Sequence, residues 1–384
     1  MHDFGSIDYE AAQAAGRREP SQFQEAVIAD LEDQWAASYR RAWPGSEIVT
    51  MNQGDVHFLF DAAPEIASAQ CARTIAAFGK VNGLRSVRDV AYQAGFPLKV
   101  NAKQAFDRGH MMPHSAGGQF GPNIYAQDRA LNRGLSAQGR RYRALERKAL
   151  SISSGIFFCH LRYSDETDIP TWVDLGLVST ATLESDTFLN RMDLLVGSDF
   201  NPLELSDAGL TSILDVLTRG QFGDLGEETA RFYLQENGAF PVSLGDSGMP
   251  RSNARQDLDM VALVEGELVA FEVKTTYLDK RAGTLTSQGN LYCPPRRRKG
   301  TRLDRSPSFA QGSSNYVAQR VESIVTVDGT LECRLIAVDL RGLKLQEFNL
   351  NGAGKSLGPK SGLVDCRGFV LRAMAEIVGH RGHL

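Results

Sequence analysis

Two apolar runs separated by a turn signal constrain the fold of this chain more than any other feature. Residues 260–264 and 268–273 consist mostly of Val, Leu, Ala, Met and Phe, and Glu265-Gly266 lies between them. Because a two-residue loop containing glycine is typical of a β-hairpin, the segment predicts two antiparallel strands. This local signal also sets which residues of the two strands face each other.

Four charged residues lie along these strands, and the turn predicts that they gather. Asp259 then faces Glu272, and Asp257 faces Lys274. Residues two apart share a face, so all four are expected on one side of the hairpin. Two carboxylates this close repel each other unless a cation lies between them, and a divalent ion would resolve the conflict. Lys274 would then orient a water or stabilise developing negative charge, which suits phosphodiester hydrolysis.

A second motif, Asp107-Arg108-Gly109-His110, lies far upstream and is followed by Asn132. Phosphodiester cleavage needs a base for the attacking water, a cation on the scissile phosphate and positive charge along the polymer. His110 supplies a base, and the neutral oxygen of Asn132 suits a hard cation such as Mg²⁺ that keeps most of its waters. An alternative is a structural turn in which the Asp and the Arg pair.

The spacing of three elements resembles the DRGH branch of the ββα-metal (His-Me finger) nucleases; the elements are residues 106–113, 122–127 and 131–134. The resemblance covers roughly residues 50–195. It implies one role for each of five residues: general base for His110, direct metal ligand for Asn132, phosphate contact for Arg108, substrate contact or site-shaping residue for Asn123, and a supporting role for Asp107.

The same resemblance implies a Glu on the metal-bearing helix, close to the water shell of the metal. Glu146 is the best match, although an insertion at 136–139 separates it from Asn132. His114 and His160 have no such motif around them, and we expect them to be polar loop or hydrogen-bonded residues rather than ligands.

The downstream hairpin resembles the PD-(D/E)xK nucleases, in which an Asp precedes a Glu-x-Lys on the next strand. Residues 226–238 look like the helix that opens the Holliday-junction-resolvase-like members, and the likeness covers roughly residues 215–345. It implies metal binding by Asp259 and Glu272, assistance by Lys274, and supporting roles for Glu227 and Asp257. The alternative is a solvated hairpin face with cross-strand ion pairs.

Positive charge is concentrated beside the two motifs, although the whole chain is slightly acidic. The chain has 42 Lys and Arg against 46 Asp and Glu, yet residues 129–148 hold seven basic and one acidic side chain, and residues 296–305 hold six and one. Such patches are expected to neutralise phosphates, with Arg133, Arg140 and Arg143 as substrate contacts. A solvated helix face and a loop are the alternative.

The chain is long enough for two or three domains. The resemblances imply an α+β chain, with an N-terminal ββα-metal domain followed by an α/β restriction-endonuclease-like domain with a central mixed sheet. We place the boundary near 197–202, where turn formers cluster. The expected parts are a helical extension at 1–45, the ββα-metal domain at 46–198, the second nuclease domain at 205–350, and a linker with a C-terminal segment at 351–384.

Local patterns predict several further elements. Residues 1–20 are polar and expected to be loosely ordered, and a helix should run from Pro20 to about Arg41, with another from a Ser206 cap through Leu217. The remaining expectations are strands at 155–163, 172–178 and 331–338 and a helix at 313–324.

The expected cofactor is Mg²⁺ or Mn²⁺, and the expected partners are nucleic acid, DNA or RNA, and an immunity or inhibitor protein, as in a bacterial toxin or defence nuclease. The first residues show neither a basic start nor an apolar run, and no stretch has the length of a membrane span, so we expect a cytoplasmic protein or one exported without a cleaved signal peptide. Five cysteines without Cys-x-x-Cys spacing indicate neither a zinc site nor a disulfide framework. Two rival classes stay open: a single-site nuclease whose C-terminal half only binds nucleic acid, and a non-catalytic interaction protein.

Overall fold

The chain forms two compact units in the computed structural model, residues 1–199 and residues 200–384. Both units combine helices with sheets, so the α+β class is confirmed. The structure describes residues 6–62, 73–80, 95, 105–114, 117–118, 121–151, 155–192, 200–242, 259–276, 290–291, 332–352 and 354–381.

Two helices open the first unit, α1 (Tyr9–Arg18) and α2 (Phe23–Ala42). The helix expected from Pro20 is confirmed, but the loose order expected for residues 1–20 is wrong for residues 9–18, which form α1. The carboxylate of Asp8 accepts a hydrogen bond from the Ala11 backbone N–H at 2.8 Å, which caps α1 at its start. Trp35 of α2 is fully buried in the core that these helices share with the sheet.

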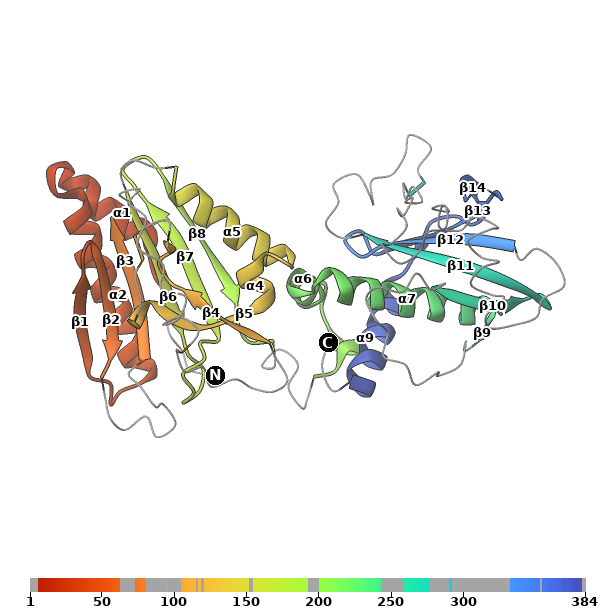
Figure 1. The fold of residues 1–384 in the computed structure, drawn as a ribbon, viewed down its shortest axis with the longest axis horizontal. Helices are drawn as coiled ribbons and strands as arrows, with labels where there is room; N and C mark the ends of the chain where they lie inside the picture. The colour runs from red at the N-terminus through yellow and green to blue at the C-terminus, as the bar shows by residue number, and fades with distance from the viewer. Residues whose placement is uncertain are drawn as a thin grey trace. The chain divides into compact units, whose positions relative to one another are not determined.

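A six-stranded sheet with only antiparallel pairings follows, in the order β1-β2-β3-β6-β7-β8. On one face, Trp35 stacks on His160 with ring centroids 5.6 Å apart, which brings α2 against the sheet (Figure 1). The strands are β1 (Ile48–Gln53), β2 (Val56–Asp61), β3 (Arg73–Lys80), β6 (Ile156–Arg162), β7 (Trp172–Val178) and β8 (Leu183–Leu189). The expectations for 155–163 and 172–178 are therefore confirmed.

A separate hairpin and two helices cover the opposite face of this sheet (Figure 1). Strands β4 (Phe106–His110) and β5 (Ile124–Asp128) pair antiparallel, and α4 (Arg129–Arg133) follows directly. Helix α5 (Ala137–Ala149) packs on the main sheet through Tyr142, whose ring meets Phe188 edge-on at 5.2 Å. The chain thus places a strand–strand–helix unit on a rigid sheet.

The second unit is built on a seven-stranded mixed sheet of order β14-β13-β12-β11-β10-β9, with β15 paired to β13. Strands β11 and β12 run parallel and the other pairs are antiparallel, so the expected central mixed sheet is confirmed. The strands are β9 (Phe240–Val242), β10 (Met260–Val264), β11 (Glu267–Thr276), β12 (Glu332–Asp339), β13 (Lys344–Leu350), β14 (Ser356–Pro359) and β15 (Val364–Asp365).

The turn predicted between β10 and β11 is present. Glu265 and Gly266 have φ angles of 51° and 88°, which is the pair of positive values that a type I′ loop requires. Met260 pairs with Phe271, the register that the turn predicts. The local sequence therefore determined both the loop and the pairing.

The described residues of the second unit form three helices: α6 (Asp207–Val216), α7 (Arg219–Glu236) and α9 (Arg367–Arg381). Ser206 caps α6 as expected, because its hydroxyl accepts a hydrogen bond from the Gly209 N–H at 3.1 Å. Helix α7 lies against β11 so closely that a Cβ built on Gly226 would lie 1.6 Å from the Thr275 hydroxyl. Residues 351–384, expected as a linker and C-terminal segment, contain β14, β15 and α9, and Val370 of α9 is fully buried.

Several predicted features lie outside the described residues, namely the basic stretch at 296–305, the helix at 313–324 and Asp257. Within the described ranges, no helix has both the length and the hydropathy needed to cross a bilayer.

Candidate active site

The β4–β5 hairpin leads directly into the helix that carries Asn132. Asp128 ends β5, and its carboxylate accepts a hydrogen bond from the Leu131 N–H at 2.7 Å, which caps α4. Gly134 adopts φ 68° and ends α4 after a single turn, because a left-handed residue stops helix propagation. Ser136 then caps α5. Asn132 is therefore held in a short helix with defined ends.

Asp107 of β4 joins the hairpin to this helix. Its carboxylate accepts hydrogen bonds from the Asn132 Nδ2 at 3.1 Å, from Arg129 at 3.1 Å, and from both Nε and Nη2 of Arg133 at 2.6 and 2.9 Å. Partial burial alone would raise the pKa of Asp107, but the hydrogen bonds from Arg133, Asn132 and Arg129 outweigh it and lower the pKa. Because a carboxylate only accepts, the amide nitrogen of Asn132 faces Asp107 and its oxygen faces away.

His110 is the last residue of β4 and pairs with Ile124 across the hairpin. Its ring stacks on that of His114, with centroids 6.2 Å apart. His110 is three positions after Asp107 on the strand, so their Cα atoms lie about 10 Å apart, and alternation directs their side chains to opposite faces. That His110 and Asn132 serve one ion therefore stays a prediction. It requires the two side chains to approach each other around the end of β4.

Asn123 is completely buried, and its carboxamide bonds both polar groups of the Met112 backbone, accepting from the N–H at 2.8 Å and donating to the C=O at 3.0 Å. The Asn123 side chain thus takes the place of a neighbouring strand's backbone, and it satisfies both polar groups of Met112 just beyond His110. This geometry favours the site-shaping role over the substrate contact. Arg108 is half-buried on β4, on the same strand face as His110.

Glu146 lies on α5 and forms an ion pair with Arg143 at 2.9 Å. Burial raises the pKa of Glu146, and Arg143 partly opposes that rise. Burial raises the pKa values of the Tyr125 and Tyr142 hydroxyls, and the charge of Glu146 raises them further. Its predicted proximity to the water shell of a metal is untested.

The basic side chains of α5 divide into two faces. Arg141 contacts Asp186 of β8 at 2.9 Å, and Lys148 pairs with Glu184 of the same strand. By contrast, Arg140 and Arg147 are exposed and form no ion pair with a carboxylate in the described part of the chain. With Arg143, these two lie at helical spacing along one stripe.

In the second unit, the predicted trio gathers at the start of β10 and the middle of β11. Lys274 contacts the carboxylate of Glu272 and lies 3.7 Å from that of Asp259. Asp259 also accepts a hydrogen bond from the Val273 N–H at 2.7 Å. The ammonium group of Lys274 thus lies between the two carboxylates, where a divalent ion was predicted.

Glu272 is only 1% exposed, so the solvated-face alternative does not describe it. Burial, followed by the charge of Asp259, raises the pKa of Glu272 to about 7, while Lys274 acts in the opposite direction. One of its oxygens, Oε2, is buried and has no hydrogen-bond partner in the described residues. A buried acceptor without a donor costs about 1–3 kcal/mol unless a ligand or water satisfies it.

Glu227 lies on α7 next to Gly226, at the level where that helix touches Thr275 of β11. Asp257 is outside the described residues. Among the described residues, no group of three or more His, Cys, Asp or Glu side chains is arranged to hold a metal ion.

His160 is confirmed as a hydrogen-bonded core residue, since its Nδ1 lies 3.0 Å from the buried carboxylate of Asp174. Burial lowers the pKa of His160, and Asp174 counters part of that effect.

The sequence reasoning overlooked one residue of the region, Asn190, which is fully buried and bonds the backbone where β5 ends. No motif surrounds it, and only its spatial contacts reveal it.

Comparisons with known proteins do not assign the chain to a family. No family model and no curated protein matches the sequence. One solved structure that matches is NucA from Streptococcus agalactiae with magnesium ion bound, at 14% identity and a TM-score of 0.24, over 38% of this chain and 85% of that one. A likeness at this TM-score assigns neither a fold nor an activity to the chain.

Proposed function

We propose that the chain is a divalent-metal-dependent endonuclease that hydrolyses phosphodiester bonds of DNA or RNA, with its principal site on the β4–β5–α4 unit. The observation that carries the proposal is the contact between Asp107 and the Asn132 amide nitrogen, which turns the amide oxygen outward beside a strand that ends in His110. The order strand, strand, helix agrees with the resemblance drawn from the motif.

The donor set fits a magnesium ion. Mg²⁺ keeps several waters and is commonly bound through one or two protein oxygens together with substrate phosphates. The Asn132 oxygen is one such donor, and the half-buried position of this residue leaves room for waters. A bound ion would neutralise charge on the scissile phosphate.

The remaining roles belong to side chains of this chain. His110 takes the proton from the attacking water, and Arg108, on the same strand face, holds a phosphate oxygen. Asp107 positions Asn132 and draws Arg133 against the hairpin. Arg133 therefore contributes positive charge beside the ion from a fixed place.

The polymer is proposed to lie along the stripe formed by Arg140, Arg143 and Arg147. Each cation that neutralises a phosphate adds roughly one unit to the slope of log affinity against log salt. The double variant Arg140→Ala/Arg147→Ala should lower that slope by about two. The matched control, Arg141→Ala/Lys148→Ala, removes the same charge from the face paired with β8 and should change the slope by less than half as much. Equal slopes for the two double variants would contradict the stripe.

The catalytic test uses supercoiled plasmid, single-stranded DNA and RNA with Mg²⁺ or Mn²⁺, and with chelator as the blank. Removing a general base typically costs 10²–10⁴-fold in rate, so His110→Ala should lose about that much. Asn132→Ala should lose activity that added metal partly restores. Cleavage that persists in both variants would mean that other residues catalyse the reaction. A wild type that cleaves none of the three substrates would refute the proposal.

A second metal site at Asp259 and Glu272 is the other candidate. The buried Oε2 of Glu272 without a donor favours it, because an ion would satisfy that oxygen. Two carboxylate ligands plus water fit a magnesium ion, which would displace the Lys274 ammonium toward the scissile phosphate. Activity lost in His110→Ala but kept in Glu272→Ala would instead assign nucleic-acid binding to the second unit.

A further inference from the structure

We infer that Asn190 is a positioning residue of the proposed nuclease site, setting the place at which β5 ends and the Asn132-bearing helix begins. The inference rests on the proposed function for its catalytic consequence, but its structural part stands on contacts alone. Asn190 follows β8 and has no exposed surface.

Its carboxamide joins two segments that are far apart in sequence. The Oδ1 atom accepts a hydrogen bond from the Asp128 N–H at 2.7 Å, and the Nδ2 atom donates to Ala126 O at 2.9 Å and to Pro170 O at 2.8 Å. The backbone N–H of Asn190 donates to Thr171 O at 2.8 Å. Both amide hydrogens are thereby used, and the end of β5 is bound to the β6–β7 loop.

The connection to the site runs through Asp128. Its backbone is held by Asn190, while its side chain caps α4 by accepting from the Leu131 N–H. Asn132 is the next residue of that single-turn helix. A shift of the Asp128 backbone would therefore move Asn132, the predicted metal ligand, because the helix between them is only one turn long.

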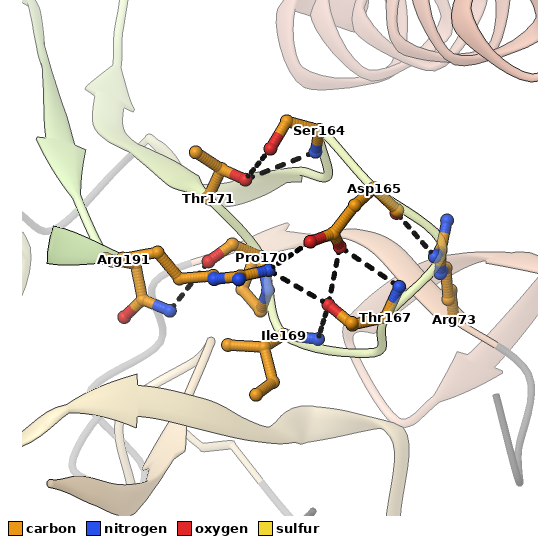
Figure 2. Close-up of polar contacts among 9 residues, drawn as sticks. Arg73, Ser164, Asp165, Thr167, Ile169, Pro170, Thr171 and Arg191 are labelled. Carbon is orange, nitrogen blue, oxygen red and sulfur yellow. Dashed lines mark hydrogen bonds and ion pairs between the residues drawn. The ribbon is translucent and has the colours of Figure 1, made fainter. Parts of the chain in front are cut away.

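The loop that receives Asn190 is itself braced (Figure 2). Asp165 forms an ion pair with Arg191 at 2.5 Å, its backbone oxygen accepts from Arg73 Nη2 at 2.7 Å, and its side chain accepts from the Thr167 N–H at 3.0 Å. Arg191 also donates to the Thr167 hydroxyl at 3.1 Å. The loop is consequently a rigid support rather than a loose connection.

Apolar packing completes the support. Ile169 of the same loop packs with Phe106 of β4 and Ala126 of β5 in a small cluster separate from the main core. The loop thus holds the first residue of the motif strand by packing and the end of the partner strand by hydrogen bonds. Both strands of the hairpin are fixed relative to the main sheet at this point.

The test compares Asn190→Ala with Gln13→Ala in the 384-residue chain. Gln13 is a matched control because its buried amide donates to Ser179 O at 2.7 Å, far from the hairpin along the sheet. A displacement of about 1 Å at a reacting group can cost 10²-fold in rate. We expect Asn190→Ala to lose at least tenfold in kcat and to need severalfold more Mg²⁺ for half-maximal activity, with KM for DNA within twofold of the wild type. Gln13→Ala should leave all three values unchanged.

Hydrogen exchange supplies a readout that needs no activity. Amides of residues 128–133 should exchange at least tenfold faster in Asn190→Ala than in the wild type, and no faster in Gln13→Ala. If Asn190→Ala does not fold, Asn190→Ser loses the same three side-chain contacts while leaving space for a water. Unchanged exchange at 128–133 in the folded variant would overturn the inference. A wild type without Mg²⁺-dependent cleavage would instead refute the proposed function, and the exchange result would still decide the positioning role.

Discussion

The raised pKa of Glu272 makes the stability of the second unit depend on pH. The carboxyl has a pKa of about 7 in the folded chain because of burial and the neighbouring Asp259, against an ordinary value of 4.5. The folded state therefore binds the proton more tightly than the unfolded state. The free energy of unfolding that this tighter proton binding contributes is fully present below about pH 4.5, and it is lost as pH rises through about 7. At ~1.4 kcal/mol per pKa unit, the loss amounts to about 3 kcal/mol at most.

The perturbation is Glu272→Gln, which keeps the shape of the side chain and removes the titration. The matched control is Glu267→Gln, an exposed position on the same strand. Protection of β11 amides against hydrogen exchange, corrected for intrinsic rates, is the right assay. The three tryptophans, Trp35, Trp43 and Trp172, all lie in the first unit, so their fluorescence would not report on this sheet.

In chelator, wild-type protection should fall between pH 5 and pH 8 by up to about 100-fold, since each 1.4 kcal/mol is a factor of ten. Glu267→Gln should follow the wild type, and Glu272→Gln should show a flat profile. Parallel profiles for the wild type and Glu272→Gln would refute the reasoning, because the pH dependence would then come from other groups.

Two further predictions concern backbone constraints in the second unit. Gly226→Ala should destabilise it by about 1–3 kcal/mol in urea denaturation followed by circular dichroism, because the new methyl group would overlap Thr275; Gly223→Ala on the same helix meets nothing within 4 Å and should stabilise it by up to ~1 kcal/mol. Equal effects of the two would contradict the close contact between helix and strand. Glu265→Asn should stabilise the second unit by about 0.5–1 kcal/mol and so raise the urea concentration at the midpoint of unfolding, because Asn tolerates the positive φ of the turn better than Glu. A lower urea midpoint would mean that the Glu265 side chain itself stabilises the fold.

Features that depend on neighbouring residues could be predicted from the sequence. The Glu265-Gly266 loop determined the register of β10 and β11, and the Ser206 hydroxyl marked the start of α6. The gathering of Asp259, Glu272 and Lys274 followed from that register and needed no knowledge of the rest of the fold. Asp8 carried a comparable capping signal for α1, which the polar composition of the first twenty residues obscured.

Features that depend on distant residues could not be predicted in this way. Spacing alone treats the basic residues of α5 as equivalent, yet Asp186 and Glu184 of a distant strand neutralise Arg141 and Lys148. Asn190 meets Asp128 across 62 positions of sequence, and nothing in the residues around it indicates the contact. Such contacts are formed by the packing of the sheet, which a single sequence does not specify at the level of individual side chains.

The Asp107 carboxylate, which can only accept hydrogen bonds, restricts which residues can replace Asn132. An aspartate there would bring a second negative group within about 3 Å of the Asp107 carboxylate, the distance at which the amide now donates. The two acids would repel each other, and the new side chain would turn outward or take up a proton. At the proposed metal site, a residue with stronger intrinsic affinity for magnesium would therefore bind it less well, because the Asp107 carboxylate accepts from an amide at position 132 and repels an acid there.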